Sequence, residues 1–358
     1  MEFKNFIDTC TNNLDVFKKN HFKIIKKRNL ILVKYIYDRP NFDYIWDKYC
    51  KGIIYDNNNK EIICIPPTKS DSIDKLYSYK NYVIQHLIDG TMINMFYYDN
   101  KWTISTRSDI GGKNRWNNNT MEYMFKQCCD YYNLCNSLNK KNCYSFVMNH
   151  KSIRNVSNVL ENKITLVEEY DLSTLCRKNT FTDLPCEKVK TIELSDNQTL
   201  QDLINEYLEN NKNNIDFKGL TIKNLDDNSR ISIVNPEYNN VKNKLCINTD
   251  NLLFKFVQTQ KNKNLHEYIN LYPEHKTKFT EYSNIYNTMC VDCLSTYHDL
   301  FVHKIIEKKN VKYQLNPIIY KLHEMFIKTN KYIDKKIVNE YITTLDCARI
   351  VFVMKYYI

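Results

Sequence analysis

Glycine is scarce in this chain, with only five among 358 residues. A glycine-rich phosphate loop of either the GxGxxG or the GxxxxGK type is therefore excluded. No apolar run approaches the roughly 20 residues that a membrane-spanning helix needs, and residues 1–10, MEFKNFIDTC, lack the apolar core of a signal peptide. We therefore expect an intracellular protein that is not associated with a membrane.

The thirteen cysteines are odd in number and scattered, without the dense spacing of a secreted disulfide scaffold. They predict reduced thiols and no disulfide framework. With 43% hydrophobic residues the chain is long enough for two domains, each with its own core. Its formal net charge of +10 favours an anionic partner such as nucleic acid, although many basic proteins bind none.

Short apolar runs alternate with turns from about residue 51 to 238 and predict antiparallel hairpins. The expected strands are residues 51–55, 61–65, 91–98, 101–107, 144–149, 163–170, 218–222 and 230–234. Helices are expected after Trp116 and after Ser195, and beyond Asp250 the pattern is helical only, with helices at 284–309, at 317–329 and in two shorter segments. The fold class is therefore α+β, with a sheet domain over residues 1–250 and an all-helical C-terminal domain over residues 251–358.

The order of several segments carries a family resemblance. These segments are Lys51-Gly52, LIDGTMINMFYYDNKWTISTRSDIGG at 87–112, the strands at 144–149 and 163–170, Lys218-Gly219 and Asn235-Pro236-x-Tyr238. In this order the chain resembles ATP-dependent RNA ligases of the branch carried by large DNA viruses, within the covalent nucleotidyltransferase superfamily. The resemblance covers most of the chain. It implies an antiparallel-sheet nucleotidyltransferase (ATP-grasp-like ligase) domain followed by a helical domain.

The chemistry that the resemblance implies begins with a lysine. In that family a lysine amine attacks the α-phosphate of ATP, while carboxylates hold a divalent ion and further lysines neutralise the phosphoryl charge. The KxDG motif that supplies this lysine matches residues 87–90, so that Leu87 stands at the nucleophile position beside Asp89 and Gly90. Leucine has no lone pair, and no lysyl-nucleotide can form at that position.

Three further motifs depart from the family pattern at four positions. The Glu-Gly pair that helps to hold the metal becomes Lys218-Gly219, and an ammonium repels a divalent cation. The two lysines of a later motif become Ser232 and Val234, and the upstream Arg-Gly becomes Lys51-Gly52. We therefore expect no intact catalytic site, no metal and no cofactor. The expected protein is a pseudoenzyme, kept for RNA binding or for a structural or regulatory role.

Two alternatives remain open. An active ATP-dependent RNA ligase would need Mg²⁺ and another lysine, with Lys80 and Lys101 as candidates, although neither precedes an x-Asp-Gly sequence. A protein-interaction scaffold without nucleic-acid affinity would differ from the pseudoenzyme only in its surface. Partners under these interpretations are RNA and other viral proteins, and the expected location is the host cytoplasm or the virion.

If RNA is bound, phosphate contacts should dominate the interaction. The cations expected to make them are Lys51, Arg107, Lys113, Arg115 and Arg154. The basic stretches 18–28 and 303–312 are further candidates, and otherwise they are expected to be solvated helix faces.

A possible metal site lies in the C-terminal region. Cys290, Cys293, His298 and His303 have the CX2CX4HX4H spacing of a zinc knuckle. This stretch is apolar at helical intervals and has no glycine, and on a continuous helix the two histidines point away from the cysteines. The sequence favours buried thiols and surface imidazoles here and leaves zinc binding open.

Overall fold

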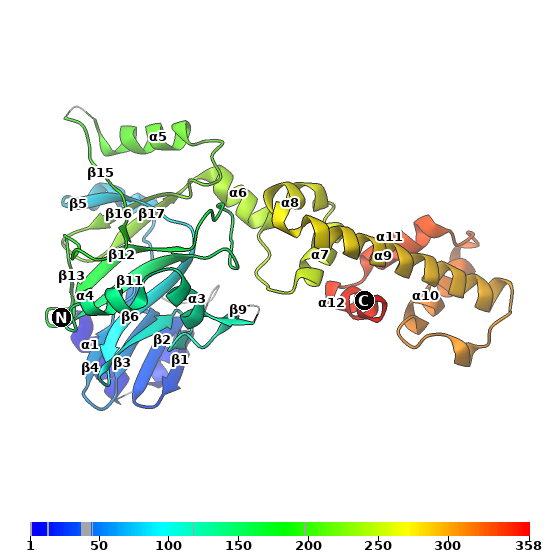
Figure 1. Cartoon of the computed structure of the whole chain (residues 1–358), viewed down its shortest axis with the longest axis horizontal. Helices are drawn as coiled ribbons and strands as arrows, with labels where there is room; N and C mark the ends of the chain where they lie inside the picture. The colour runs from blue at the N-terminus through cyan, green and yellow to red at the C-terminus, as the bar shows by residue number, and fades with distance from the viewer. Residues whose placement is uncertain (1, 13, 37–43, 45, 117, 197) are drawn as a thin grey trace. The chain divides into compact units, whose positions relative to one another are not determined.

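The computed structural model describes residues 2–12, 14–36, 44, 46–116, 118–196 and 198–358. It divides into two compact units, Met1–Lys244 and Leu245–Ile358. The first unit combines antiparallel sheets with helices, and the second consists of helices (Figure 1). The α+β class expected from the sequence is therefore confirmed. Among the described residues no helix has both the length and the hydrophobicity that a bilayer span requires.

Four sheets organise the described part of the first unit. Their strands are β1 (Phe22–Lys27), β2 (Leu30–Tyr35), β3 (Lys51–Asp56), β4 (Glu61–Cys64), β5 (Tyr82–His86), β6 (Thr91–Tyr98), β7 (Lys101–Thr106), β8 (Asp109–Ile110), β9 (Arg115–Trp116), β10 (Asn119–Thr120), β11 (Asn142–Asn149), β12 (Lys163–Asp171), β13 (Cys176–Arg177), β14 (Glu187–Lys188), β15 (Thr191–Ile192), β16 (Gly219–Asn224) and β17 (Arg230–Val234). The sheets run in the orders β1-β2-β3-β4, β13-β12-β11-β6-β7-β8 with β14 beside β12, β15-β5-β16-β17, and β10-β9.

The helices fall into two groups. The first unit has α1 (Glu2–Asn12), α2 (Asp15–Lys19), α3 (Met121–Gln127), α4 (Tyr131–Ser137), α5 (Leu200–Asn210) and α6 (Pro236–Leu245), which ends at the boundary. The second has α7 (Leu252–Lys261), α8 (Leu265–Leu271), α9 (Lys276–Tyr297), α10 (Asn316–Thr329), α11 (Lys335–Thr344) and α12 (Cys347–Met354).

The hairpins predicted from the sequence are confirmed. Strand β3 pairs with β4, β6 with β7, β11 with β12 and β16 with β17, all antiparallel. The hairpin of β1 and β2 was not predicted, and the interpretation of residues 18–28 as a helix face is wrong, because most of this stretch is strand β1. Its lysines alternate too irregularly with apolar residues to give a clear period-2 pattern.

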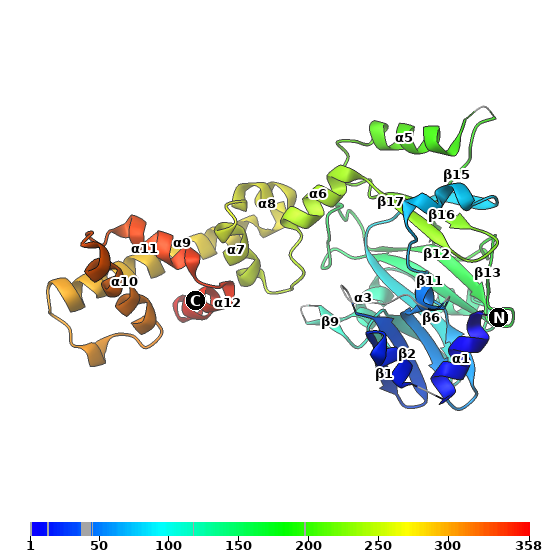
Figure 2. The same cartoon turned by 180° about the vertical axis from the view of Figure 1, so that it is seen from behind.

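Each large sheet of the first unit is covered by helices. Helix α1 lies beside the β1–β4 sheet (Figure 2), and its Phe6 belongs to the hydrophobic core that contains residues of these strands. Phe125 of α3 and Leu134 of α4 pack in the core of the seven-stranded sheet. Leu203 and Ile204 of α5 pack against the β15-β5-β16-β17 sheet. Residues of these three sheets also line one shared cavity.

The helix predicted over residues 284–309 has different bounds in the structure. Helix α9 begins at Lys276, and after Tyr297 the chain continues as a single π-helical segment, His298–Val302. Lys304 then has a φ of 56°, a left-handed conformation that a right-handed helix cannot contain. The expectation of a helix face over 303–312 is therefore wrong as well, since this stretch has only a short 3₁₀ turn at Lys308–Asn310.

Two glycines fix the backbone next to the cavity. Gly90 has a φ of 144° and Gly219 a φ of 140°. A Cβ at Gly219 would lie 2.0 Å from the carbonyl oxygen of Ile233, and one at Gly90 would lie 2.6 Å from that of Met148. Only glycine permits both this conformation and this close approach of neighbouring strands.

Candidate functional site

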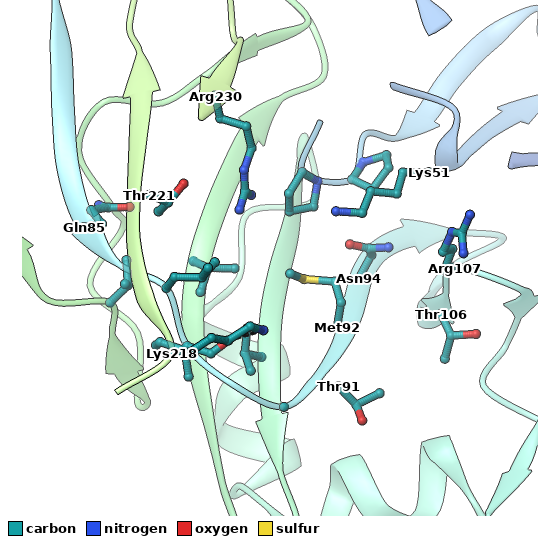
Figure 3. A pocket seen from close by; sticks show the side chains of 18 of the residues that line it. Lys51, Gln85, Thr91, Met92, Asn94, Thr106, Arg107, Lys218, Thr221 and Arg230 are labelled. Carbon is teal, nitrogen blue, oxygen red and sulfur yellow. Dashed lines mark hydrogen bonds between the residues drawn. The ribbon is translucent and has the colours of Figure 1, made fainter. Parts of the chain in front are cut away.

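A cavity of about 500 Å³ opens in the first unit where strands of three sheets meet. Its lining includes residues of β3, β5, β6, β16 and β17 (Figure 3). The cationic side chains that line it are Lys51, Arg107, Lys218, Lys223, Arg230 and Lys242. No aspartate or glutamate is among the lining residues in the described part of the chain. The cavity is thus suited to an anionic ligand.

Strands β16 and β17 supply two of these cations in register. Lys223 pairs with Arg230 across the ladder, so both side chains leave the same face of the sheet. Leu220 and Ile222, on the opposite face, lie in the core that α5 covers. Two positive charges directly opposite each other on a sheet repel. The buried carboxylate of Glu168, in β12, offsets this repulsion, because its Oε1 lies 3.3 Å from both Lys223 Nζ and Arg230 Nη1.

This cluster is charged at neutral pH. Burial alone would raise the pKa of Glu168, but Lys223, Arg177 and Arg230 outweigh it and lower the pKa to about 2. Burial lowers the pKa of Lys223 to about 8, against the attraction of Glu168. Three cations therefore face one carboxylate, and the cluster keeps a net positive charge beside the cavity.

One hydrogen-bond donor of Arg230 has no acceptor among the described residues. Its side chain is 7% exposed and points into the cavity (Figure 3). One guanidinium nitrogen contacts Glu168 and another lies 3.4 Å from Ser232 Oγ. Its Nε has no hydrogen-bond partner within the described residues. A buried N–H without an acceptor costs about 1–3 kcal/mol, which an anionic ligand in the cavity would recover.

Lys51 enters the cavity from a different sheet, as the first residue of β3 (Figure 3). Burial, assisted by the positive charges of Arg230, Arg107 and Lys218, lowers the pKa of Lys51 to about 7 against the opposing effect of Glu168. The amine of Lys51 therefore exchanges its proton near neutral pH. It can bind an anion as an ammonium or act as a neutral amine.

The segment matched to the family's KxDG motif borders the same cavity. Leu87 follows β5 and lines the cavity, with its backbone N–H donating to the Gly219 carbonyl at 2.8 Å. Asp89 is buried and is not one of the residues that line the cavity. Its carboxylate accepts from the Tyr238 hydroxyl at 2.7 Å and, at 2.9–3.2 Å, from Gly90, Asn155, Val156 and Ser157. Asp89 thus joins loops together and does not line this cavity.

Lys218 is held at the cavity wall. Its ammonium donates to the Ile88 carbonyl at 3.1 Å and lies 3.8 Å from Asp89 Oδ1. Burial lowers the pKa of Lys218, Asp89 raises it, and Lys242 and Arg230 lower it. A fixed cation therefore occupies the position where the resemblance expects a carboxylate.

The two positions matched to the family's phosphate-binding lysines do not line the cavity. Ser232 Oγ hydrogen-bonds to Ser70 Oγ at 2.6 Å. Val234 is partly exposed at the end of β17, opposite Gly219. The positive charge that β17 brings to the cavity comes instead from Arg230, at the start of the strand.

The five cations expected to contact nucleic acid are dispersed. Lys51 and Arg107 line the cavity. Lys113 is exposed, pairs with Glu122 at 2.6 Å and lines a different cavity. Arg115 lies exposed in β9, outside both cavities. The structure thus brings two of the five together.

Arg154, the fifth of these cations, lies outside the lining set and donates to the backbone carbonyls of Val156 and Ser157, both at 3.2 Å. The alternative nucleophiles are also remote from the lining. Lys80 is exposed, and Lys101 is exposed at the start of β7, where it lines the second cavity of about 480 Å³. Neither lysine contributes to the cavity that holds Leu87.

The zinc-knuckle residues lie on two kinds of helix. Cys290 and Cys293 are buried in α9, whereas His298 begins the π-helical segment and His303 follows it. Burial raises the pKa of both thiols to about 12. His298 Nε2 lies 3.1 Å from the Ile333 carbonyl. Among the described residues no group of three or more His, Cys, Asp or Glu is arranged to hold a metal ion.

Four charged residues of the site were missed by the sequence reasoning: Glu168, Lys223, Arg230 and Lys242. A signal for two of them exists in the strand patterns. In GLTIKN and RISIV the apolar residues alternate with Thr221, Lys223, Arg230 and Ser232, and period-2 alternation places these polar residues on one face. Because the two strands pair with each other, the polar residues of both strands lie side by side on one face of the sheet.

Comparisons with known proteins give only distant likeness. Neither a protein-family model nor a curated protein matches the chain. Among solved structures, a putative ATP-dependent DNA ligase from Aquifex aeolicus matches with a TM-score of 0.43 and 12% identity. The match covers 89% of this chain and 80% of the Aquifex protein. Naegleria gruberi RNA ligase, as a mutant with ATP and Mn, has a TM-score of 0.37 and 17% identity over 49% of this chain. The match spans 57% of the Naegleria ligase.

Proposed function

We propose that this chain is a non-catalytic, RNA-ligase-like protein that binds the phosphorylated 5′ end of RNA. The observation that carries the proposal is the cavity lining, with six cationic side chains and, in the described part of the chain, no carboxylate. A 5′-phosphate would supply a negative counter-charge to these cations and an acceptor to the Nε of Arg230. Charge-assisted hydrogen bonds from buried arginine and lysine to phosphate are among the stronger kinds.

A second wall of the cavity favours a nucleotide over a bare phosphate. Met92, Val147, Val167 and Val189 line it and belong to one apolar cluster. The cavity volume also lies within the roughly 300–1,000 Å³ typical of small-molecule sites. A terminal nucleotide can place its base on this apolar wall and its phosphates among the cations.

The non-catalytic character follows from the residues at the motif positions. Leu87 offers no nucleophile, and Asp89 is fully engaged by its hydrogen bonds. The choice of RNA comes from the sequence resemblance. So do an origin in a large DNA virus, other viral proteins as partners, and a location in the host cytoplasm or the virion.

The test is fluorescence anisotropy with one single-stranded RNA that carries a 5′-hydroxyl, a 5′-monophosphate or a 5′-triphosphate. Affinity should rise with the charge of the end. It should fall steeply between about 50 and 200 mM salt as counterions are released. Lys51→Gln should reduce the preference for the triphosphate end, while Lys60→Gln, at an exposed turn outside the cavity, should not. Equal binding of the three ends would refute end recognition, and no binding at micromolar protein would favour a protein-interaction scaffold.

A second candidate function is an ATP-dependent RNA ligase that uses a non-standard lysine. One observation favours it: Lys51 reaches into the cavity with its pKa lowered to about 7 by burial. Incubation with α-labelled ATP and Mg²⁺, followed by denaturing electrophoresis, separates the two candidates. Our proposal expects no labelled band. A band that disappears in Lys51→Gln and persists in Lys60→Gln would contradict our proposal and show nucleotidyl transfer that depends on Lys51, as the ligase requires.

A further inference from the structure

The sequence resemblance implies a divalent cation beside the phosphates, but the donor set at the cavity does not fit one. Mg²⁺ takes hard oxygen ligands in near-octahedral geometry, and proteins hold it through carboxylates. The lining residues that the structure describes include none. Two carboxylates outside the lining, Asp89 and Glu168, pair with cations of the lining and are the candidates for a metal ligand.

Asp89 has no free position for a metal. Its Oδ1 accepts from the Tyr238 hydroxyl, the Asn155 amide and the Gly90 N–H. Its Oδ2 accepts from the backbone N–H groups of Val156 and Ser157. A metal ligand at Asp89 would have to break several of these bonds.

Glu168 is unsuitable for a different reason. Its side chain is fully buried and does not belong to the lining set. Its Oε1 already lies 3.3 Å from both Lys223 and Arg230. A divalent ion at this carboxylate would sit within a few ångströms of two fixed positive charges, which repel it.

Lys218 already supplies a cation at the cavity wall. Its ammonium is anchored by the Ile88 carbonyl at 3.1 Å and by Asp89 at 3.8 Å. A protein ammonium neutralises one phosphate charge without any coordination geometry. Together with Lys223 and Arg230 it gives the cavity several such charges in fixed places.

We propose that the cavity binds its ligand as the metal-free anion of a 5′-triphosphate end, and that Mg²⁺ opposes this binding. The inference rests on the function proposed above and specifies the ionic form of the ligand. Mg²⁺ on the triphosphate lowers the negative charge that attracts the cavity and adds a cation among cations. The free anion instead meets each ammonium and guanidinium directly.

The experiment compares triphosphate-ended with hydroxyl-ended RNA of the same sequence, in EDTA and in excess MgCl₂ at equal ionic strength. Hydroxyl-ended RNA reports the general screening of the RNA backbone by Mg²⁺. The measured quantity is the ratio of the two affinities, which isolates the contribution of the end. We expect this preference to be at least about fivefold larger in EDTA than in Mg²⁺, in line with the loss of one or more charge-assisted hydrogen bonds.

A charge-reversed variant sharpens the test. Lys218→Glu puts a carboxylate next to Asp89 and should invert the result, so that the preference becomes larger in Mg²⁺ than in EDTA. Lys60→Glu makes the same charge change at an exposed turn outside the cavity and should behave as the wild type. If Lys218→Glu does not fold, as judged by circular dichroism, Lys218→Gln serves in its place and should reduce the preference in EDTA.

The outcomes are distinct. A preference in the wild type that is equal or larger in Mg²⁺ overturns the inference and leaves end recognition intact. The absence of any end preference in both buffers removes the proposed function, and the inference falls with it. A preference confined to EDTA that inverts in Lys218→Glu supports both.

Discussion

Proton uptake on ligand binding is the sharpest consequence of the site's electrostatics. Burial lowers the pKa of Lys51 to about 7 from its usual value of 10.5. A phosphate bound beside this amine favours the ammonium and raises the pKa again. Binding and protonation of Lys51 are therefore linked, and the affinity should fall as the pH rises above 7.

The size of the effect follows from the two protonation states. If the bound phosphate restores the pKa to 10.5, linkage makes the affinity about 50-fold weaker at pH 9 than at pH 7. The same treatment gives an uptake of about 0.5 proton per ligand at pH 7 and about 0.9 at pH 8. Partial restoration of the pKa gives smaller values with the same sign.

Lys51 is one of several titratable groups at the cavity, and burial also lowers the pKa of Lys218. Glu168 stays ionised because its pKa is about 2. Burial lowers the pKa of His86, which is therefore neutral above pH 7. Lys223, with its pKa lowered to about 8 by burial, does titrate in this range. The terminal phosphate has a second pKa near 6 and remains ionised.

The assay is isothermal titration calorimetry of a triphosphate-ended RNA in two buffers with different ionisation enthalpies, from pH 7 to pH 9 in EDTA. The difference between the two observed enthalpies gives the number of protons taken up. Lys51→Gln should lose most of this uptake and most of the pH dependence, whereas Lys60→Gln should keep both. Uptake near zero at pH 8 in the wild type, or the same uptake in Lys51→Gln, would refute this account of the cavity.

Three further predictions address stability and chemistry. Glu168→Gln should destabilise the fold by about 3–5 kcal/mol, because it leaves Lys223 and Arg230 buried without their carboxylate; urea unfolding followed by circular dichroism measures it. Gly219→Ala should cost about 2–5 kcal/mol by the same assay, since its Cβ would lie 2.0 Å from the Ile233 carbonyl oxygen. Leu87→Lys should give no labelled adduct with α-labelled ATP and Mg²⁺, because residues that act as one catalytic unit do not contribute additively; a labelled band would refute our interpretation of the later motifs.

The sequence was most informative where short apolar runs flank a turn. The β6–β7 and β16–β17 hairpins were predicted from such runs on both sides of a turn signal. The β1–β2 hairpin escaped prediction, because the lysines of FKIIKK blur its period. The end of the long C-terminal helix escaped too, since it depends on a left-handed residue, Lys304, that no glycine marks.

The candidate site was only partly predictable for a related reason. Lys51 and Lys218 were found because glycine motifs mark their positions. Glu168, Lys223 and Arg230 come from strands of two sheets and form one cluster only after those sheets pack together. A sequence shows which face of a strand is polar, but the partner across the interface depends on tertiary packing.

The arrangement of charges explains why the cavity should matter to the stability of the fold as well as to binding. Lys51, Lys218 and Lys223 all have pKa values lowered by burial, so folding brings cations together at a cost while the cavity holds no anion. A ligand that binds only the folded state recovers this cost and stabilises the protein in proportion to its concentration. A core of well-packed apolar residues would not have this electrostatic cost, whereas functional sites commonly lower the stability of the fold. The concentration of buried positive charge around one cavity is therefore best understood as a binding surface whose counter-charge is the ligand.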